Sequence, residues 1–282
     1  ELMLNFKGNY SVIFRAYDQG VAYRFAASEK DSIWIQNEEV NLQFSQNYPT
    51  IVPYVRKDNP QTFEEQFFNS FENTYTHSKL SELDKRRLMF LPLVVELNDG
   101  KKLCITEADL ESYPGLYLNK GEDQSLRGVF APYPKHVKQG GNNMLQGLVT
   151  ERENYIAKCK GSRNFPWRVF AVSTNDKELL DNDLVYLLAS PSRVEDISWI
   201  KPGKVAWEWW NDWNLYGVDF KSGINNSTYK YYIDFASKQG IEYVILDEGW
   251  AVNKQADLLQ VIPQLDIREL IDYGKSRNVG II

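Results

Sequence analysis

The chain has 282 residues, of which 43% are hydrophobic and 14% aromatic, and its formal net charge is −6 at pH 7. This composition excludes a disordered chain and supplies enough apolar surface for the cores of one or two domains. The longest basic run is Lys85-Arg86-Arg87, so the basic footprint of a nucleic-acid-binding protein is absent. No apolar stretch approaches the roughly 20 residues of a membrane span.

The first part of the chain consists of short strand patterns separated by turn residues. Residues 10–17 and 21–25 alternate in polarity around Asp18-Gln19-Gly20, which predicts a hairpin. Asn98-Asp99-Gly100 predicts a second hairpin turn, between strands at 88–97 and 101–106. Further strands are predicted at 32–36, 126–131, 146–150, 155–158 and 167–173. Many short strands with frequent turns predict a β-sandwich over residues 1–190.

A helix and a linker follow in the sequence. Residues 177–188 predict one helix, and residues 191–203 predict a linker because prolines stand at both of its ends, at 191 and 202. The cysteines Cys104 and Cys159 each fall in a predicted strand, and we expect both to be reduced and buried. His77 and His136 have no His or Cys at ligand spacing, so a zinc site is not indicated.

The last part of the chain has the rhythm of a parallel α/β unit. Strands are predicted at 204–208, 242–247 and 279–282. The first helix between them is expected to begin at an N-cap formed by Ser227 or Thr228 and to end before Gly240. The second is expected to begin with the capping pattern of Asp266 and Glu269. This alternation predicts the opening of a (β/α)8 TIM barrel over 204–282, and the barrel is expected to be incomplete because a whole one needs roughly 250 residues.

The stretch Ile241–Trp250 is the most informative candidate for a functional site. Its apolar strand runs directly into Asp247, Glu248 and Trp250 at the strand end where barrel enzymes bind substrates. Carboxylates accept hydrogen bonds from hydroxyls, and a tryptophan face packs against a sugar ring, so a carbohydrate site is indicated. The alternatives are a loop cap for Asp247, a salt bridge for Glu248 and a roof over the barrel for Trp250.

A second candidate region follows the first predicted barrel strand. Tryptophans stand at 209, 210 and 213, with Asn211 and Asp212 between them. Loops in this position build the rim of a barrel active site. If the strand continues, Trp209 and Trp210 point to opposite faces, so at most one faces the pocket. Trp210 and Asp212 are therefore candidates for substrate contact, with packing and loop capping as the alternatives.

Five stretches of the chain carry a resemblance to a known family: GNYSVIFRAYDQGVAYRF at 8–25, ITEADLESYPG at 105–115, FPWRVFAV at 165–172, KPGKVAWEWWNDW at 201–213 and YYIDFASKQGIEYVILDEGW at 231–250. With them the chain resembles glycoside hydrolase family 97, the calcium-dependent α-glucosidase and α-galactosidase family. The resemblance implies an N-terminal β-super-sandwich, a central (β/α)8 barrel and a C-terminal β domain. We expect this chain to hold most of the first, without its earliest strands, the opening of the second and none of the third. The family also implies a periplasmic or secreted protein of a Gram-negative bacterium.

The resemblance also implies a mechanism with two carboxyl groups. One branch of the family retains anomeric configuration with an aspartate nucleophile and a glutamate acid/base, and the other inverts it with two glutamates. Because these residues lie on later barrel strands, we expect them beyond Ile282 and assign no catalytic residue in this chain. The amino-acid sequence of residues 206–220 favours the retaining, α-galactosidase-like branch. The alternatives are an inverting α-glucosidase of the same family and, from another class, a non-catalytic carbohydrate-binding β-sandwich.

The resemblance further implies a bound Ca2+ ion and an oligosaccharide or α-glycoside substrate. In this family a glutamate of the sandwich helps to hold the metal, and Glu107 in ITEADLESYPG matches it best, with Asp109 and Glu111 as alternates. The other interpretation of Glu107 is a solvated loop acid. Because Ca2+ takes 6 to 8 oxygen ligands, one carboxylate does not make the site. The sequence indicates no oligomeric state.

Overall fold

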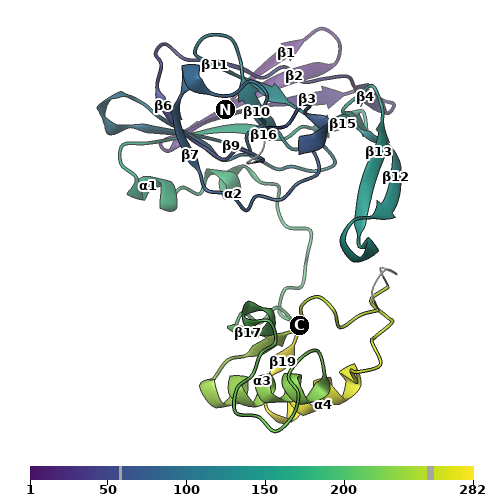
Figure 1. Cartoon of the computed structure of the whole chain (residues 1–282). Coiled ribbons are helices and arrows are strands. Elements are labelled where there is room, and N and C mark those ends of the chain that lie inside the picture. Colours follow the sequence, from purple (N-terminus) through teal and green to yellow (C-terminus); the bar gives the residue numbers. More distant parts are fainter. Residues whose placement is uncertain (57–58, 253–256) are drawn as a thin grey trace. The chain divides into compact units, whose positions relative to one another are not determined.

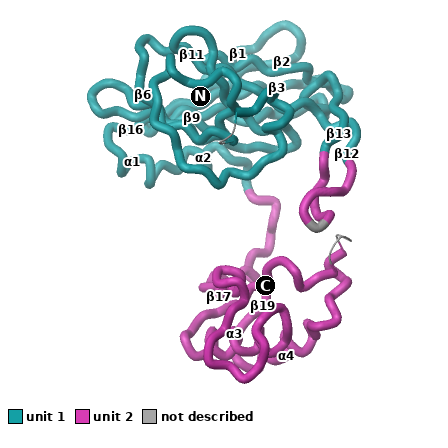
Figure 2. Tube along the Cα trace, viewed as in Figure 1, with its two compact units in different colours: residues 1–137, 149–191 teal, residues 138–148, 192–282 magenta. Residues whose placement is uncertain are grey.

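The computed structural model describes residues 1–56, 59–252 and 257–282. The chain divides into two compact units, each of which is described by itself (Figure 2). The first contains residues 1–137 and 149–191, and the second contains residues 138–148 and 192–282. No helix among the described residues is long and apolar enough to cross a membrane.

The first unit is built mainly from sheets (Figure 1). Among the described residues, the largest sheet has nine strands in the order β1-β2-β3-β16-β9-β8-β6-β7, with β15 also paired to β3. A smaller sheet has the order β10-β11-β5, and β4 pairs with β14. Strands β12 and β13 form a hairpin whose outer part is assigned to the second unit. The strands are β1 (Leu2–Phe6), β2 (Tyr10–Tyr17), β3 (Gly20–Ser28), β4 (Ile33–Ile35), β5 (Asn41–Gln43), β6 (Pro49–Val52), β7 (Thr76–Lys79), β8 (Leu93–Glu96), β9 (Lys102–Ala108), β10 (Tyr117–Lys120), β11 (Ser125–Val129), β12 (Pro134–Gly140), β13 (Gln146–Arg152), β14 (Ala157–Cys159), β15 (Ser162–Asn164) and β16 (Trp167–Ser173).

Both faces of the large sheet are covered by apolar side chains. On one face, Leu93 and Ile105 share a core with Leu118 and Leu126 of the small sheet. On the other face, side chains of β16 pack with residues of α2 (Leu184–Leu188). Strand β16 is therefore buried on both sides, as is typical of a central strand.

The two predicted hairpins are confirmed. Strands β2 and β3 pair antiparallel with Tyr17 opposite Gly20, and β8 and β9 pair on either side of the Asn98–Gly100 turn. Gly20 has φ +147°, and a Cβ there would lie 2.2 Å from the carbonyl oxygen of Phe170. No other residue type fits this close approach of two strands.

Two predictions in this unit are wrong in extent. Strand β8 covers only part of the predicted range 88–97, because Pro92 offers no N–H to a ladder. The predicted helix at 177–188 is two short helices, α1 (Lys177–Leu180) and α2. Asn182 separates them, since its side chain accepts a hydrogen bond from the Leu184 N–H and donates one to the Gln19 carbonyl.

The second unit is a parallel α/β unit. Its sheet has the order β17-β18-β19, and the predicted parallel pairing of 204–208 with 242–247 is confirmed. The elements are β17 (Val205–Trp207), α3 (Asn226–Gln239), β18 (Tyr243–Ile245), α4 (Ile267–Ser276) and β19 (Gly280–Ile281), with a 3-10 turn at Glu208–Asn211.

Helices α3 and α4 lie on one face of the parallel sheet (Figure 1). Ala206 and Val244 point to that face and pack with Tyr229, Ile233 and Leu270 of the helices. The alternate residues of β17, Val205 and Trp207, remain 44% and 43% exposed. The second face of the sheet is therefore apolar and open.

Of the three predicted helix ends in this unit, one is wrong and two are confirmed. The N-cap of α3 is Asn225, whose side chain accepts a hydrogen bond from the Thr228 N–H, rather than Ser227 or Thr228. Gly240 ends α3 in the left-handed conformation, with φ +65°. Asp266 caps α4 by accepting from the Glu269 N–H.

The cysteines are both free thiols. Cys159 is buried, whereas Cys104 is only partly buried, so the expectation of burial is wrong for Cys104. Burial nevertheless raises the pKa of the Cys104 thiol.

Candidate functional site

The ends of the parallel strands β17 and β18 bring acids and tryptophans together. Trp207 lies opposite Ile245 in the register, so the residues just beyond each strand meet at one edge of the sheet. Glu208 follows β17, and Asp247 follows β18 after one residue. This edge is the carboxyl end of both strands, the place where open parallel sheets and barrels bind ligands.

Asp247 is held at this edge by three hydrogen bonds. Its Oδ2 accepts from the indole Nε1 of Trp207 at 2.6 Å, and its Oδ1 accepts from the Glu248 N–H at 2.6 Å. Its own N–H donates to Oε1 of Glu208 at 2.8 Å. Asp247 is half-buried, and an ionised carboxylate offers about four acceptor sites, so two remain for other donors. The carboxylate both caps its own turn and keeps the capacity to accept sugar hydroxyls.

The other predicted residues near β18 have different environments. Glu248 is exposed. Trp250 is half-buried and packs against the apolar core of the second unit. Packing therefore accounts for part of the Trp250 side chain, and both residues stay predictions as substrate contacts.

The tryptophan segment after β17 turns away from the strand direction. The strand ends at Trp207 and a 3-10 turn follows, so the condition under which Trp209 and Trp210 would point to opposite faces of a strand is not met. Trp210 is 83% exposed, with its ring 5.8 Å from that of Trp207. Asp212 is exposed and has φ +56°. Trp210 and Asp212 are thus accessible on the same segment and remain candidates for substrate contact.

Glu208 was not among the predicted site residues. It is fully buried, and its Oε1 accepts from Asp247 N–H, Tyr229 hydroxyl and Trp213 Nε1 at 2.8, 3.2 and 3.3 Å. Its Oε2 is buried without a hydrogen-bond partner in the described part of the chain. Burial, with Glu208 beside it, raises the pKa of the Tyr229 hydroxyl. The signal in the sequence was an acid at the end of an apolar strand, inside a run of tryptophans.

In the first unit, Glu107 belongs to a buried ionic network. It lies on β9 directly opposite Arg168 of β16, whose guanidinium donates to its Oε2 at 2.6 Å. The same guanidinium donates to both carboxylate oxygens of Glu38 at 2.7 Å each. The Glu107 carboxylate also accepts from the Leu116 N–H. Burial raises the pKa of Glu107, and the Arg168 charge opposes that rise. Sequence reasoning identified Glu107 but neither Arg168 nor Glu38, the other charged members of this network.

Asp109 and Glu111, the alternative metal ligands to Glu107, also accept hydrogen bonds from neighbouring residues. Asp109 accepts from the N–H and hydroxyl of Ser190 at 2.9 and 3.0 Å and pairs with Arg24 at 3.3 Å. Glu111 is exposed, and its carbonyl accepts from Arg163 at 2.7 Å.

The described residues do not fit a calcium ion on their own. No group of three or more His, Cys, Asp or Glu residues suited to a metal occurs in the part of the chain that the structure describes. Glu107 supplies one carboxylate, and one of its oxygens already faces a guanidinium. A Ca2+ ion requires several more oxygen ligands than this.

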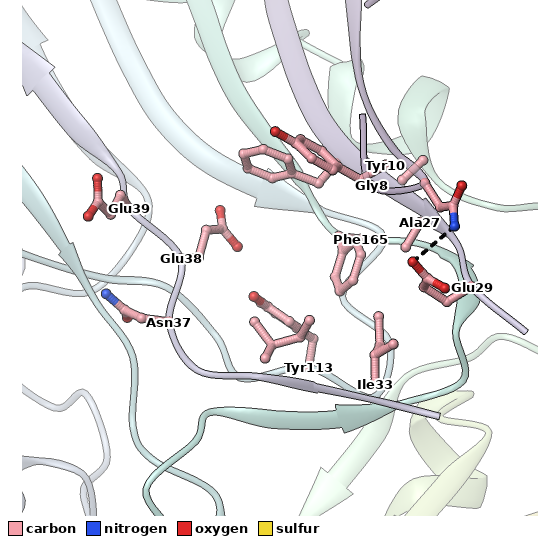
Figure 3. A pocket seen from close by; sticks show the side chains of 14 residues that line it. Gly8, Tyr10, Ala27, Glu29, Ile33, Asn37, Glu38, Glu39, Tyr113 and Phe165 are labelled. Carbon is pink, nitrogen blue, oxygen red and sulfur yellow. Dashed lines mark hydrogen bonds between the residues drawn. The ribbon is translucent and has the colours of Figure 1, made fainter. Parts of the chain in front are cut away.

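A pocket of about 330 Å³ opens on the first unit (Figure 3). Figure 3 shows Glu38 and Tyr113 pointing toward the same space, and burial raises the pKa of the Tyr113 hydroxyl beside Glu38. Asn9 donates to Glu29 at another side of the pocket at 3.2 Å. Aromatic faces next to carboxylates and amides suit a small polar ligand with an apolar face. The lining residues are Gly8, Asn9, Tyr10, Phe25, Ala26, Ala27, Glu29, Ile33, Ile35, Asn37, Glu38, Glu39, Tyr113 and Phe165.

A sheet-rich unit is followed in the chain by a parallel α/β unit that carries tryptophans and acids at the strand ends where barrel enzymes bind their substrates. The family model described as Glycosyl-hydrolase 97 N-terminal matches residues 1–191, and the one described as Glycoside hydrolase 97 matches residues 209–282. The chain belongs to glycoside hydrolase family 97.

Comparison with a named relative and with solved structures agrees with this family. A retaining α-galactosidase of Bacteroides thetaiotaomicron is 59% identical over 282 residues, which is 100% of this chain and 43% of that protein. A family 97 enzyme of Pseudoalteromonas sp. strain K8, solved with acarbose, is 24% identical with a TM-score of 0.73, over 96% of this chain and 39% of that one. A β-arabinopyranosidase is 20% identical with a TM-score of 0.70, over 98% of this chain and 40% of that one. The two structures show likeness of fold, and the chain spans less than half the length of these relatives.

Proposed function

We propose that the protein containing this chain is a retaining α-galactosidase. The observation that carries this proposal is the 59% identity, along the whole chain, to a retaining α-galactosidase. The site at the strand ends supports it, since Asp247 keeps acceptor capacity for hydroxyls beside exposed tryptophans. The inverting α-glucosidase expected as the alternative has no comparable support.

The parallel unit is proposed to be the opening of a (β/α)8 barrel that follows the β-super-sandwich. Parallel sheets are normally covered on both faces. Helices α3 and α4 cover only one face here, and Val205 and Trp207 of the other face are exposed. In a barrel this second face points inward and is covered by the remaining strands.

Within this proposal the strand-end residues bind the sugar and do not perform the bond cleavage. Asp247 accepts hydrogen bonds from hydroxyls of the terminal galactose, and Trp210 offers an exposed ring to a sugar face. Asp212, Glu248 and Trp250 are proposed as additional contacts. The nucleophile and the acid/base are assigned to none of these residues.

Calcium is proposed as the bound metal, with Glu107 as the ligand that the first unit contributes. Its support is the match of Glu107 in ITEADLESYPG to the metal-holding glutamate of the family, and Oε1 is the carboxylate oxygen that Arg168 does not contact. This proposal requires further oxygen ligands, and no suitable group of three or more His, Cys, Asp or Glu residues occurs among the residues that the structure describes. When bound, the metal would supply electrostatic stabilisation near the glycosidic oxygen.

The test uses the intact protein with p-nitrophenyl α-galactoside and α-glucoside. We expect hydrolysis of the galactoside with α-galactose as the first product seen by NMR, since retention preserves the anomer. We expect activity to fall after treatment with EDTA and to return with Ca2+. Release of β-galactose as the first product would contradict the retaining mechanism. Full activity after complete chelation would contradict the proposal that calcium is bound.

Asp247→Asn tests the proposed sugar contact in the same assay. Two hydrogen bonds to a charged group contribute about 1.5 kcal/mol or more each, so we expect kcat/KM to fall about 100-fold. The control is Asp272→Asn, which changes an exposed acid of α4 and is expected to leave kcat/KM unchanged. Equal kinetics of the two variants would rule out Asp247 as a sugar ligand.

A second candidate function is carbohydrate binding by the first unit alone, and the pocket beside Glu38 and Tyr113 favours it. Calorimetry with raffinose distinguishes the two functions. Binding that is abolished by Tyr113→Ala, in a protein that hydrolyses neither aryl glycoside, would support the binding module. We also propose a periplasmic or secreted location, which rests on the family and is tested by cell fractionation.

A further inference from the structure

We propose that Glu208 is a positioning residue that sets the orientation of Asp247 for sugar recognition. The inference rests on the proposed function, because it assigns a role in the same site. Glu208 itself is fully buried and is not offered as a sugar contact.

Glu208 joins four parts of the second unit at one oxygen. It directly follows β17, and its Oε1 accepts from Tyr229 of α3, from Trp213 of the tryptophan segment and from the Asp247 N–H beyond β18. The bond to Asp247 is the shortest of the three, at 2.8 Å. A single acceptor therefore ties the end of the second strand to the end of the first.

Trp207, the residue before Glu208, also binds Asp247. Trp207 donates from its indole to Asp247 Oδ2 at 2.6 Å, while Glu208 accepts from the Asp247 main chain. Two consecutive residues of one strand end thus fix both the side chain and the backbone of the acid on the next. The directions of the remaining Asp247 lone pairs depend on both contacts.

Burying the carboxylate of Glu208 lowers stability unless the hydrogen bonds that its oxygen accepts are required. Buried acids are rare without a cation, and Oε2 finds no donor in the described part of the chain. An apolar side chain of similar size would avoid that cost but would leave Asp247 N–H, Tyr229 hydroxyl and Trp213 indole without their acceptor. Because only Oε1 accepts, glutamine can keep all three hydrogen bonds.

The test compares Glu208→Leu with the conservative Glu208→Gln in the intact protein. We expect Glu208→Leu to raise KM for p-nitrophenyl α-galactoside at least 10-fold with a smaller change in kcat, and Glu208→Gln to restore KM to within about 3-fold, since the acceptor is kept. Tyr229→Phe removes one of the other donors and keeps the Asp247 bond, so it is expected to lower Tm without changing KM. If Glu208→Leu does not fold, Glu208→Asp carries the same expectation, because its shorter chain withdraws the acceptor.

A double-mutant cycle with Asp247→Asn separates positioning from a general structural role. If Glu208 acts through Asp247, Glu208→Leu raises KM at least 10-fold in the wild-type background and less than 3-fold in the Asp247→Asn background. Equal fold-changes in both backgrounds overturn the proposal, as does an unchanged KM in Glu208→Leu. A wild-type protein that neither hydrolyses the substrate nor binds galactose overturns the proposed function as well.

Discussion

At the scale of single residues, the acids of the candidate site differ in how far the sequence predicts them. Asp247 was predicted because it follows a continuous apolar strand, and the structure places it at the strand end with spare acceptor capacity. Glu208 was missed because its sequence position is that of a last strand residue. Its role depends on three donors that come from residues 213, 229 and 247, which no local pattern connects.

Arg168 offers a prediction about buried charge. Arg168 is 1% exposed, and its guanidinium lies between the carboxylates of Glu38 and Glu107. Arg168→Met leaves two buried carboxylates without a cation, so we expect a loss of about 3–5 kcal/mol in the free energy of unfolding at pH 7. The measurement is urea denaturation, with Arg86→Met as the control because its pair with Asp84 is exposed.

The pH dependence of that variant follows from Glu107. Burial raises the pKa of Glu107 above its ordinary value of 4.5, and loss of Arg168 raises it further. A carboxyl with a raised folded pKa favours the folded state below its unfolded pKa, and this stability is lost as pH rises through the folded pKa. The deficit of Arg168→Met should therefore shrink as pH falls through the raised folded pKa of Glu107, which lies above 4.5. A deficit that is independent of pH would show that lost packing, not charge, is the cause.

At the scale of elements, patterns of alternation and turn residues predicted strands better than they predicted helix ends. The β2–β3 and β8–β9 hairpins follow from turn chemistry that is local in the sequence. The split between α1 and α2 does not, because Asn182 bonds to Gln19, which is far away in the chain. The α3 cap was misplaced by two or three residues, since Asn225, Ser227 and Thr228 are all good capping types.

The cap of α3 gives a direct test. Asn225→Ala removes the acceptor for the Thr228 N–H, so we expect a loss of about 1 kcal/mol in the stability of the second unit. Ser227→Ala is the matched control, because Ser227 is exposed and is not the cap, and it should change stability by less than about 0.5 kcal/mol. Thermal unfolding followed by circular dichroism compares the two. A larger loss of stability in Ser227→Ala would show that Ser227, as predicted from the sequence, is the N-cap of α3.

At the scale of the whole molecule, the sequence predicted a sheet-rich part followed by a parallel α/β part, and both are present. Strand order was beyond the sequence, because β16 pairs with β3 and β9 across long stretches of chain. The site was predictable only as separate segments. Their meeting at one sheet edge follows from the register of β17 and β18.

The cores of the two units lead to a prediction about fragments. Every residue of the two core clusters of the first unit lies within residues 1–191. We therefore expect a fragment of residues 1–191 to fold alone, with a cooperative thermal transition and a native near-ultraviolet circular dichroism spectrum. A fragment of residues 192–282 should associate instead, because Val205 and Trp207 leave one face of its sheet apolar and uncovered. Sedimentation velocity measures this association, and a stable monomer of 192–282 would contradict it.

The hydrogen bond from Trp207 to Asp247 makes the Trp207 indole a spectroscopic probe of the Asp247 carboxylate. The vibrational and emission properties of an indole respond to the strength of the bond that its nitrogen donates. If Asp247 binds a sugar hydroxyl as proposed, the hydroxyl would draw electron density from Oδ2 and weaken the 2.6 Å contact with Trp207. Ultraviolet resonance Raman difference spectra between wild type and Trp207→Phe would then register occupancy of the carboxylate without a labelled ligand.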